Sequence, residues 1–214
     1  MENFYKNTIS IDEFEDKLLY VIKEAISKLF KNSKLPRKER ELNKMFSIEV
    51  WNLRSNVKPF RIRPNSKKIS NDIDDPSNDK EPEVTCELDY YSDPPIEYDI
   101  ECKRLVNPKS NWCRYYVEGG IKRFLTLEHC YSRGYEKGLM VGYIIDLDFD
   151  DAFSAVNGYV IKNSYPIMTL TDGWYTNGIS RLDQTFVDRE FEPKPFYLRH
   201  LWVDFREKFI LEKN

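Results

Sequence analysis

The chain has 214 residues, of which 41% are hydrophobic and 14% aromatic, and it carries a net charge of −3. This composition argues against intrinsic disorder, and the charge argues against a protein that coats nucleic acid over its whole surface. No apolar run approaches the ~18 residues that a bilayer span needs, and the first residues lack the features of a signal peptide. We therefore expect a cytoplasmic protein with no membrane contact.

Two helices are predicted at the start of the chain, over residues 11–30 and 37–52. The first has an apolar stripe at helical spacing, and Ser10 followed by Glu13 forms a capping box at its N-terminus. The second also has an apolar side. Residues 57–63 then predict a short strand.

A hairpin is predicted in the middle of the chain. Residues 65–82 are rich in Asp, Ser, Asn, Lys and Pro, which predicts a flexible loop. Residues 83–91 and 95–105 each alternate between apolar and polar side chains, as strands do. The Ser-Asp-Pro-Pro cluster between them predicts the turn.

Helices and strands are both predicted in the remainder. Residues 114–127 predict a helix whose Gly119–Gly120 pair would allow close packing on the sheet, although glycine is costly in a helix. The continuous apolar run at 139–147 predicts a central strand, and 149–161 predicts another helix. Further strand-like runs extend the sheet at 167–170, 179–187 and 196–205.

Zinc chemistry is not expected. The four cysteines show no Cys-x-x-Cys spacing and the chain has only two histidines, so we expect reduced, largely buried thiols. His200 is better explained as a structural histidine than a catalytic one. The acidic residues of 146–151 are expected to cap the helix that follows them.

The strand at 95–105 carries the most informative pattern. Asp99, Glu101 and Lys103 would share one face, with apolar residues on the other. Burying these charges is costly unless they are paired. A metal ion held by the carboxylates, with the lysine reaching a phosphate or a water, would account for the pattern.

Glu101 and Lys103 resemble the Glu-x-Lys signature of the PD-(D/E)XK, or restriction-endonuclease-like, nuclease superfamily. Of three acid-x-Lys matches in the chain, only this one lies on a strand-like alternation. The predicted order over about residues 11–147 is the αβββαβ core of that superfamily. The resemblance implies a mixed α/β (α+β) fold with a central mixed sheet flanked by helices. We expect one domain over residues 1–214, with a C-terminal β extension at about 148–214.

The superfamily's other acid lies on the preceding strand. Glu83, which follows a proline, would stand for the Asp of the family name, while Glu87 and Asp89 share its face of the strand. We expect the hairpin to place Glu87 or Asp89 nearest Glu101. We therefore rank Glu87 first, Glu83 second and Asp89 third.

Other polar residues are candidates for the same site. Asp99 could be an additional ligand, although a solvated charge would suit its place equally well. A helix glutamate, Glu39 or Glu41, could complete the site, as in some families of the superfamily. Three basic residues could contact nucleic acid: Arg104, Lys122 and Arg123. A surface helix often carries such charges without any role in binding.

The resemblance also implies a cofactor and a mechanism. Mg²⁺, for which Mn²⁺ could substitute, prefers oxygen ligands. Glu101, the acid of the preceding strand and the backbone carbonyl of Cys102 would hold it. Lys103 would orient or deprotonate the attacking water and stabilise the developing charge on phosphorus. The Cys102 side chain should point into the core.

These expectations converge on a metal-dependent DNA endonuclease. Action on RNA remains an alternative, and a role in restriction or antiphage defence follows only from how stand-alone domains resembling this one are used. A homodimer could form, since many nucleases that this chain resembles dimerise to cut both strands, and a partner protein of a defence system could supply targeting. The main alternative is a catalytically inactive subunit that binds nucleic acid or a partner protein.

Overall fold

A seven-stranded mixed sheet forms the centre of the protein, in the order β1-β2-β3-β4-β7-β6-β5. The computed structural model describes residues 11–57, 61–65, 67, 80–89, 96–107, 111–176 and 178–210. The strands in chain order are β1 (Arg61–Pro64), β2 (Val84–Asp89), β3 (Ile96–Leu105), β4 (Lys137–Ile144), β5 (Thr169–Thr176), β6 (Ile179–Phe186) and β7 (Phe196–Asp204). The central strands β3, β4 and β7 are parallel to one another, and the other neighbours pair antiparallel.

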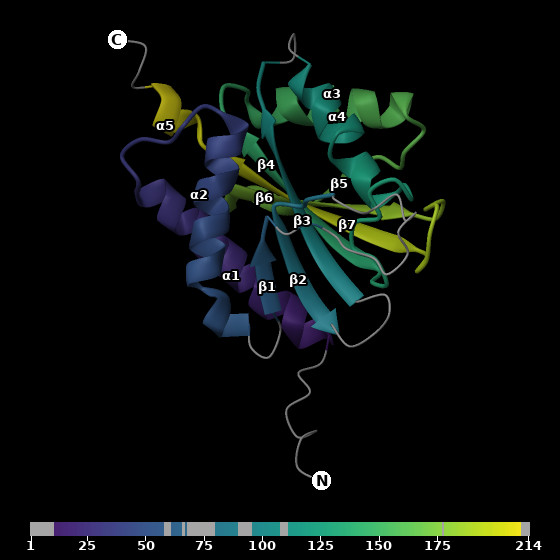
Figure 1. Ribbon diagram of the computed structural model, residues 1–214. Helices are drawn as coiled ribbons and strands as arrows, with labels where there is room; N and C mark the ends of the chain where they lie inside the picture. Colours follow the sequence, from purple (N-terminus) through teal and green to yellow (C-terminus); the bar gives the residue numbers. More distant parts are fainter. Residues whose placement is uncertain are drawn as a thin grey trace.

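Two N-terminal helices cover one face of the sheet (Figure 1). These are α1 (Ile11–Lys31) and α2 (Glu39–Asn52), followed by the 3-10 helix η1 (Arg54–Val57). Their apolar stripes pack on alternate residues of β2, β3 and β4 and form the first half of the core. The short C-terminal helix α5 (Arg206–Ile210) adds Phe209 to the same cluster.

The opposite face is covered by α3 (Trp112–Glu118), the 3-10 helix η2 (Ile121–Phe124) and α4 (Phe149–Lys162) (Figure 1). Their buried side chains form a second core cluster with Leu105, Met140 and Trp202. Helices on both faces leave the central strands buried on both sides, which explains the continuous apolar run in β4. The predicted mixed α/β class with flanking helices is confirmed.

The element order also agrees with the sequence prediction from α1 to β4. The predicted C-terminal strands are present, and β7 inserts between β4 and β6 rather than at the sheet's end. Within the described ranges, no helix combines the length and apolarity that a membrane span needs. Most of the predicted loop at 65–82 lies outside the described residues.

The prediction of a single helix over residues 114–127 is wrong. Helix α3 ends at Glu118, Gly119 is its C-cap, and the chain continues as η2. A Cβ on Gly120 would lie 2.4 Å from the Tyr116 carbonyl oxygen and 2.5 Å from Met140 Cε. The glycine therefore lets the backbone turn tightly against β4, which brings η2 close to β3.

The register of the β2–β3 hairpin positions the candidate site. Val84 at the start of β2 pairs with Ile100, while β3 continues to Leu105. Among the described residues, the last part of β3 therefore has no strand on its β2 side, and its backbone groups there need other partners.

Candidate active site

Strand β3 separates apolar and charged side chains as predicted. Tyr98, Ile100 and Cys102 are fully buried in the cluster beneath α1 and α2. Glu101 and Lys103 project to the other face and are also buried, at 0% and 7% exposure. The prediction that the Cys102 side chain enters the core is confirmed.

Two glutamates bind the free backbone edge of β3. Glu83, just before β2, accepts a hydrogen bond from the Cys102 N–H through Oε2 at 3.2 Å. Glu39, at the start of α2, accepts one from the Arg104 N–H through Oε2 at 3.0 Å. The edge that β2 leaves unpaired thus draws two carboxylates to the end of β3.

The Lys103 ammonium lies among these acids. Its Nζ donates to Glu101 Oε1 and, at 3.2 Å, to the Cys102 carbonyl oxygen, and it is 3.5 Å from Glu39 Oε1. Burial alone would lower the pKa of Lys103, but the charges of Glu101, Glu83 and Glu39 outweigh it and raise that pKa above its ordinary value. Lys103 therefore stays positively charged.

Glu101 has a second cationic partner. Arg123 Nη1 donates to Glu101 Oε1 at 2.9 Å and to the Tyr131 hydroxyl at 3.2 Å. Burial opposes ionisation of Glu101, but Lys103 and Arg123 together hold its pKa below the ordinary value. Glu101 Oε2 is buried and has no hydrogen-bond partner among the described residues.

Glu83 has the opposite protonation preference. Burial of its carboxyl group, reinforced by the charge of Glu101, raises the pKa of Glu83 well above the ordinary value. The pKa values of the two neighbouring carboxyl groups are therefore shifted in opposite directions, that of Glu101 downward and that of Glu83 upward. Asn43 Nδ2 fixes Glu83 from the α2 side by donating to Oε1 at 2.7 Å.

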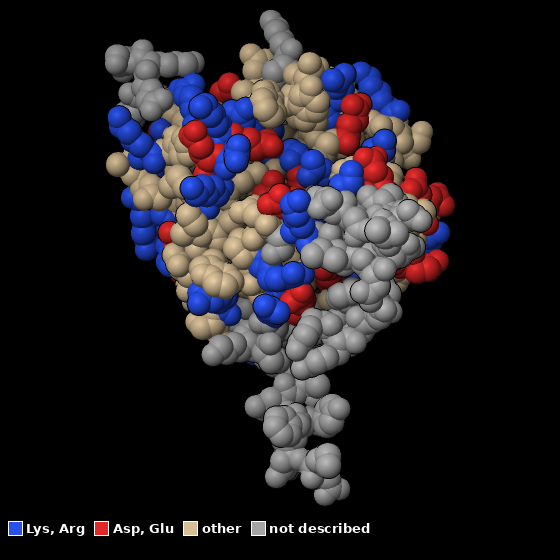
Figure 2. Space-filling model, in the orientation of Figure 1, with Lys and Arg blue, Asp and Glu red and all other residues tan. Residues whose placement is uncertain are grey.

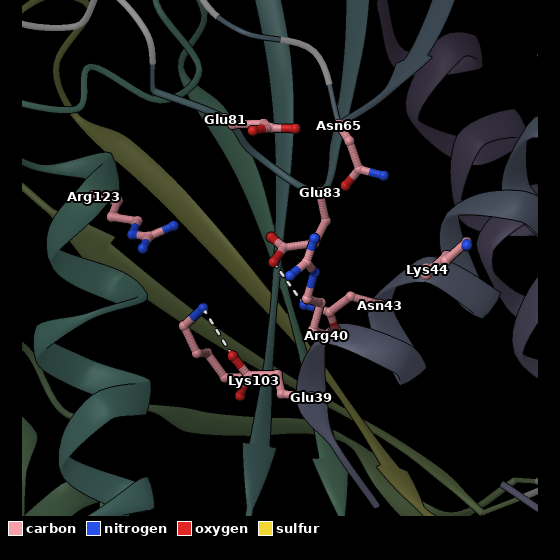
Figure 3. A pocket seen from close by; sticks show the side chains of 9 residues that line it. All are labelled: Glu39, Arg40, Asn43, Lys44, Asn65, Glu81, Glu83, Lys103 and Arg123. Atoms are coloured by element: carbon pink, nitrogen blue, oxygen red, sulfur yellow. Dashed lines mark hydrogen bonds and ion pairs between the residues drawn. The ribbon is translucent and has the colours of Figure 1, made fainter. Parts of the chain in front are cut away.

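Most of these groups, although not the fully buried Glu101, open onto a pocket of about 650 Å³ between α2 and the segment that carries Arg123 (Figure 3). Its volume lies within the range of small-ligand sites. Charged or amide side chains line it: Glu39, Arg40, Asn43, Lys44, Asn65, Glu81, Glu83, Lys103 and Arg123. Figure 2 shows basic side chains interspersed with acidic ones on the face drawn.

The expectation that the hairpin places Glu87 or Asp89 nearest Glu101 is wrong. Glu87 pairs with Glu97 in the hairpin, and Arg63 Nη2 binds its carboxylate at 2.5 Å. Asp89 pairs with Ile96 at the far end of β2. The register instead brings Glu83 to Glu101, because Val84 lies opposite Ile100.

Asp99 does not line the pocket, and it is not a solvated charge. It is fully buried, and it accepts hydrogen bonds from the Thr85 hydroxyl and the Ser132 N–H, both at 2.6 Å. These bonds tie β3 to β2 and to the segment after η2. Of the two candidate helix glutamates, Glu39 reaches the site, whereas Glu41 pairs with Lys38 at 3.6 Å on the surface.

The three predicted nucleic-acid contacts have different surroundings. The Arg104 guanidinium stacks over Trp112 at 4.0 Å and donates to the Arg37 carbonyl, and it does not line the pocket. Lys122 is exposed outside the pocket lining. Arg123 lies in the pocket but binds a carboxylate. Contact with nucleic acid remains a prediction for all three.

The donor set limits how a metal ion could be held. Within the described part of the chain, no group of three or more His, Cys, Asp and Glu residues is arranged to hold one. Glu83 and Glu101 offer two carboxyl groups, one with an unsatisfied buried oxygen, and the Cys102 carbonyl is adjacent. This set fits Mg²⁺, which commonly uses one or two carboxylates and completes its shell with water and phosphate oxygens.

Two structural expectations outside the site are confirmed. His200 is fully buried between the Tyr116 hydroxyl at 2.9 Å and Gln184 Oε1 at 3.0 Å. Asp148 is the N-cap of α4 and accepts from the Asp151 N–H at 2.9 Å.

Asn43 and Tyr131 are site residues that the sequence reasoning missed. Asn43 lies four residues after Glu39 on the predicted helix, so helical spacing alone could have placed both on one face. Nothing in the sequence around Tyr131 indicates its contact with Arg123. Comparison with protein-family models, curated proteins and solved structures found no match to this chain.

Proposed function

We propose that the protein is a Mg²⁺-dependent nuclease that hydrolyses phosphodiester bonds, with DNA as the first substrate to test. The observation that carries the proposal is the convergence of Glu83, Glu101 and Lys103 beside a polar pocket. Glu83 and Lys103 line this pocket, and Glu101 is buried directly behind Lys103. The glutamates come from adjoining strand segments, and a buried carboxyl pair beside a charged lysine is costly to maintain without a function.

Each group has a role in phosphodiester hydrolysis. Glu83, Glu101 and the Cys102 carbonyl would hold Mg²⁺, which would neutralise phosphate charge and lower the pKa of a coordinated water. Lys103 stays charged, so stabilising negative charge and orienting the attacking water suit it better than proton abstraction. Asn43 and the Cys102 N–H orient Glu83.

The rest of the pocket suits a phosphate-rich ligand. Arg40 and Lys44 lie one helical turn apart on α2 and line the pocket near Glu39 and Asn43 (Figure 3). Their exposed cations could bind phosphates next to the scissile one. This local basic wall is compatible with a net charge of −3, because binding would be confined to one pocket.

A catalytically inactive, nucleic-acid-binding subunit is the second candidate. Lys103 and Arg123 already compensate Glu101, and burial raises the pKa of Glu83, so the cluster could also persist as a buried ion-pair network. A role in restriction or antiphage defence, with a partner protein or second copy supplying targeting, extends either candidate.

Labelled oligonucleotides distinguish the candidates. Wild type, Glu101→Gln and Lys103→Met would be assayed for binding and for cleavage of single- and double-stranded DNA and RNA with Mg²⁺ or Mn²⁺. Glu118→Gln is a matched control, because Glu118 forms a surface pair with Arg114 at 3.5 Å. Metal-dependent cleavage lost only in the two site variants supports the nuclease. Binding without cleavage by folded wild type supports the inactive subunit.

A further inference from the structure

Arg123 is the pocket cation that is placed both at the carboxyl pair and at the opening. Its guanidinium bonds Glu101 Oε1 and the Tyr131 hydroxyl through the same nitrogen, and 29% of its side chain remains exposed. The Lys103 side chain, by comparison, is only 9% exposed, and its ammonium is surrounded by three oxygen atoms. Of the two cations that contact Glu101, Arg123 is therefore the one whose remaining N–H donors can reach a ligand in the pocket.

The segment around Arg123 is firmly held. The Tyr131 N–H donates to the Arg123 carbonyl at 3.2 Å, so these two residues are joined through both backbone and side chain. Arg189, at 1% exposure, donates to the carbonyl oxygens of Phe124, Tyr131 and Ser132. Arg123 thus faces Glu101 from a rigid support, and exchange of its partner requires only a side-chain movement.

The charges around Arg123 determine how it would respond to a bound cation or phosphate. At the buried end of the pocket, the three carboxyl groups of Glu39, Glu83 and Glu101 lie around the two cations of Lys103 and Arg123. A divalent cation at Glu83 and Glu101 would add positive charge next to Arg123 and compete with it for Glu101. A phosphodiester would relieve that repulsion by offering Arg123 an anionic partner.

We infer that Arg123 is a built-in counter-ion that competes with the divalent cation for Glu101 and passes to a substrate phosphate when both ligands are bound. The inference rests on the proposed function and deepens it, because it makes cation and nucleic acid bind cooperatively. By linkage, each ligand strengthens the other by the same factor. The site would then hold its cation tightly only when nucleic acid is present.

Manganese binding without nucleic acid tests the first half of the inference. Free Mn²⁺ would be measured by electron paramagnetic resonance during titration of wild type, Arg123→Gln and Arg123→Lys. Arg114→Gln is the matched control, since Arg114 pairs with Glu118 on the surface. We expect Arg123→Gln to bind Mn²⁺ about tenfold more tightly. Arg123→Lys keeps the charge and should stay near wild type, as should Arg114→Gln.

The second half is tested by repeating the titration with a saturating phosphorothioate DNA duplex. The duplex should strengthen Mn²⁺ binding to wild type and Arg114→Gln, and clearly less to Arg123→Gln. The counter-ion role would be overturned if Arg123→Gln bound Mn²⁺ no more tightly than wild type. If Glu101→Gln abolished Mn²⁺ binding in the same experiment, the proposed metal site would still be supported. If wild type binds no Mn²⁺ under either condition, the inference and the metal-dependent function fail together.

Discussion

Glu83 lies beside Glu101 because the strand edge holds it there. Its Oε2 accepts the N–H of Cys102, the residue after Glu101, at 3.2 Å, at the point where β2 no longer covers β3. A backbone requirement at the end of a hairpin therefore produces the paired carboxyl groups. Glu39 repeats the arrangement two residues further along the strand.

The identity of the second acid can be tested by isosteric substitution. Glu83→Gln should lower metal-dependent cleavage by about 100-fold, because it removes a proposed ligand while keeping most of the shape. Glu87→Gln should change cleavage by no more than a few-fold, because Glu87 is bound by Arg63 outside the pocket. Initial rates measured on one DNA substrate, with circular dichroism to verify folding, check both. Loss of cleavage in Glu87→Gln alone would restore the ranking made from the sequence.

Asn43 should act by orienting Glu83. Asn43→Ala removes the 2.7 Å hydrogen bond to Glu83 Oε1 and should weaken Mn²⁺ binding about 10-fold or more. The expected loss in free energy of unfolding is only ~1–2 kcal/mol. Asn163→Ala is the control, since Asn163 caps α4 through the Tyr159 carbonyl away from the pocket. Equal Mn²⁺ affinity in the two variants would rule out a positioning role for Asn43.

Alanine substitutions at Gly120 and Gly158 can be compared to test whether the turn into η2 requires a glycine. Gly120→Ala would place a Cβ 2.4 Å from a backbone oxygen and should cost ~1–3 kcal/mol of stability. At Gly158 in α4, a Cβ would meet nothing within 4 Å beyond its own stretch of helix, so Gly158→Ala should stabilise by up to ~1 kcal/mol. Urea unfolding of both variants measures the difference. Similar stabilities would mean that η2 does not need the close approach at Gly120.

Acid should destabilise the fold through His200. Burial lowers the pKa of His200 from 6.5 to about 3, so the native state leaves it neutral while the unfolded chain protonates it. The free energy of unfolding should therefore fall as the pH drops below 6.5, by at most ~1.4 kcal/mol per pH unit. Urea unfolding at pH 7 and pH 5 should show a smaller pH dependence for His200→Gln than for wild type. An equal dependence would contradict a neutral buried His200.

The sequence predicted what depends on local pattern. Alternation identified the strand with Glu101 and Lys103 and assigned Cys102 to the core, and the order of elements was correct through β4. Which acid lies next to Glu101 depends instead on the register of the β2–β3 hairpin. An error in the predicted register changes which residue of one strand lies opposite each residue of the other. The break at Gly119 and Gly120, and with it the direction of Arg123, depends on packing against Met140. Such long-range contacts leave no local signal.

We propose that Glu83, Glu101 and Lys103 form a phosphodiester-cleaving site, and the first measurement to make is the nicking of supercoiled plasmid with Mg²⁺. Wild type would be compared with Glu101→Gln and the surface control Glu118→Gln. We expect wild type and the control to nick the plasmid, and we expect EDTA or the Glu101→Gln substitution to abolish nicking. Equal nicking by Glu101→Gln would contradict this proposal.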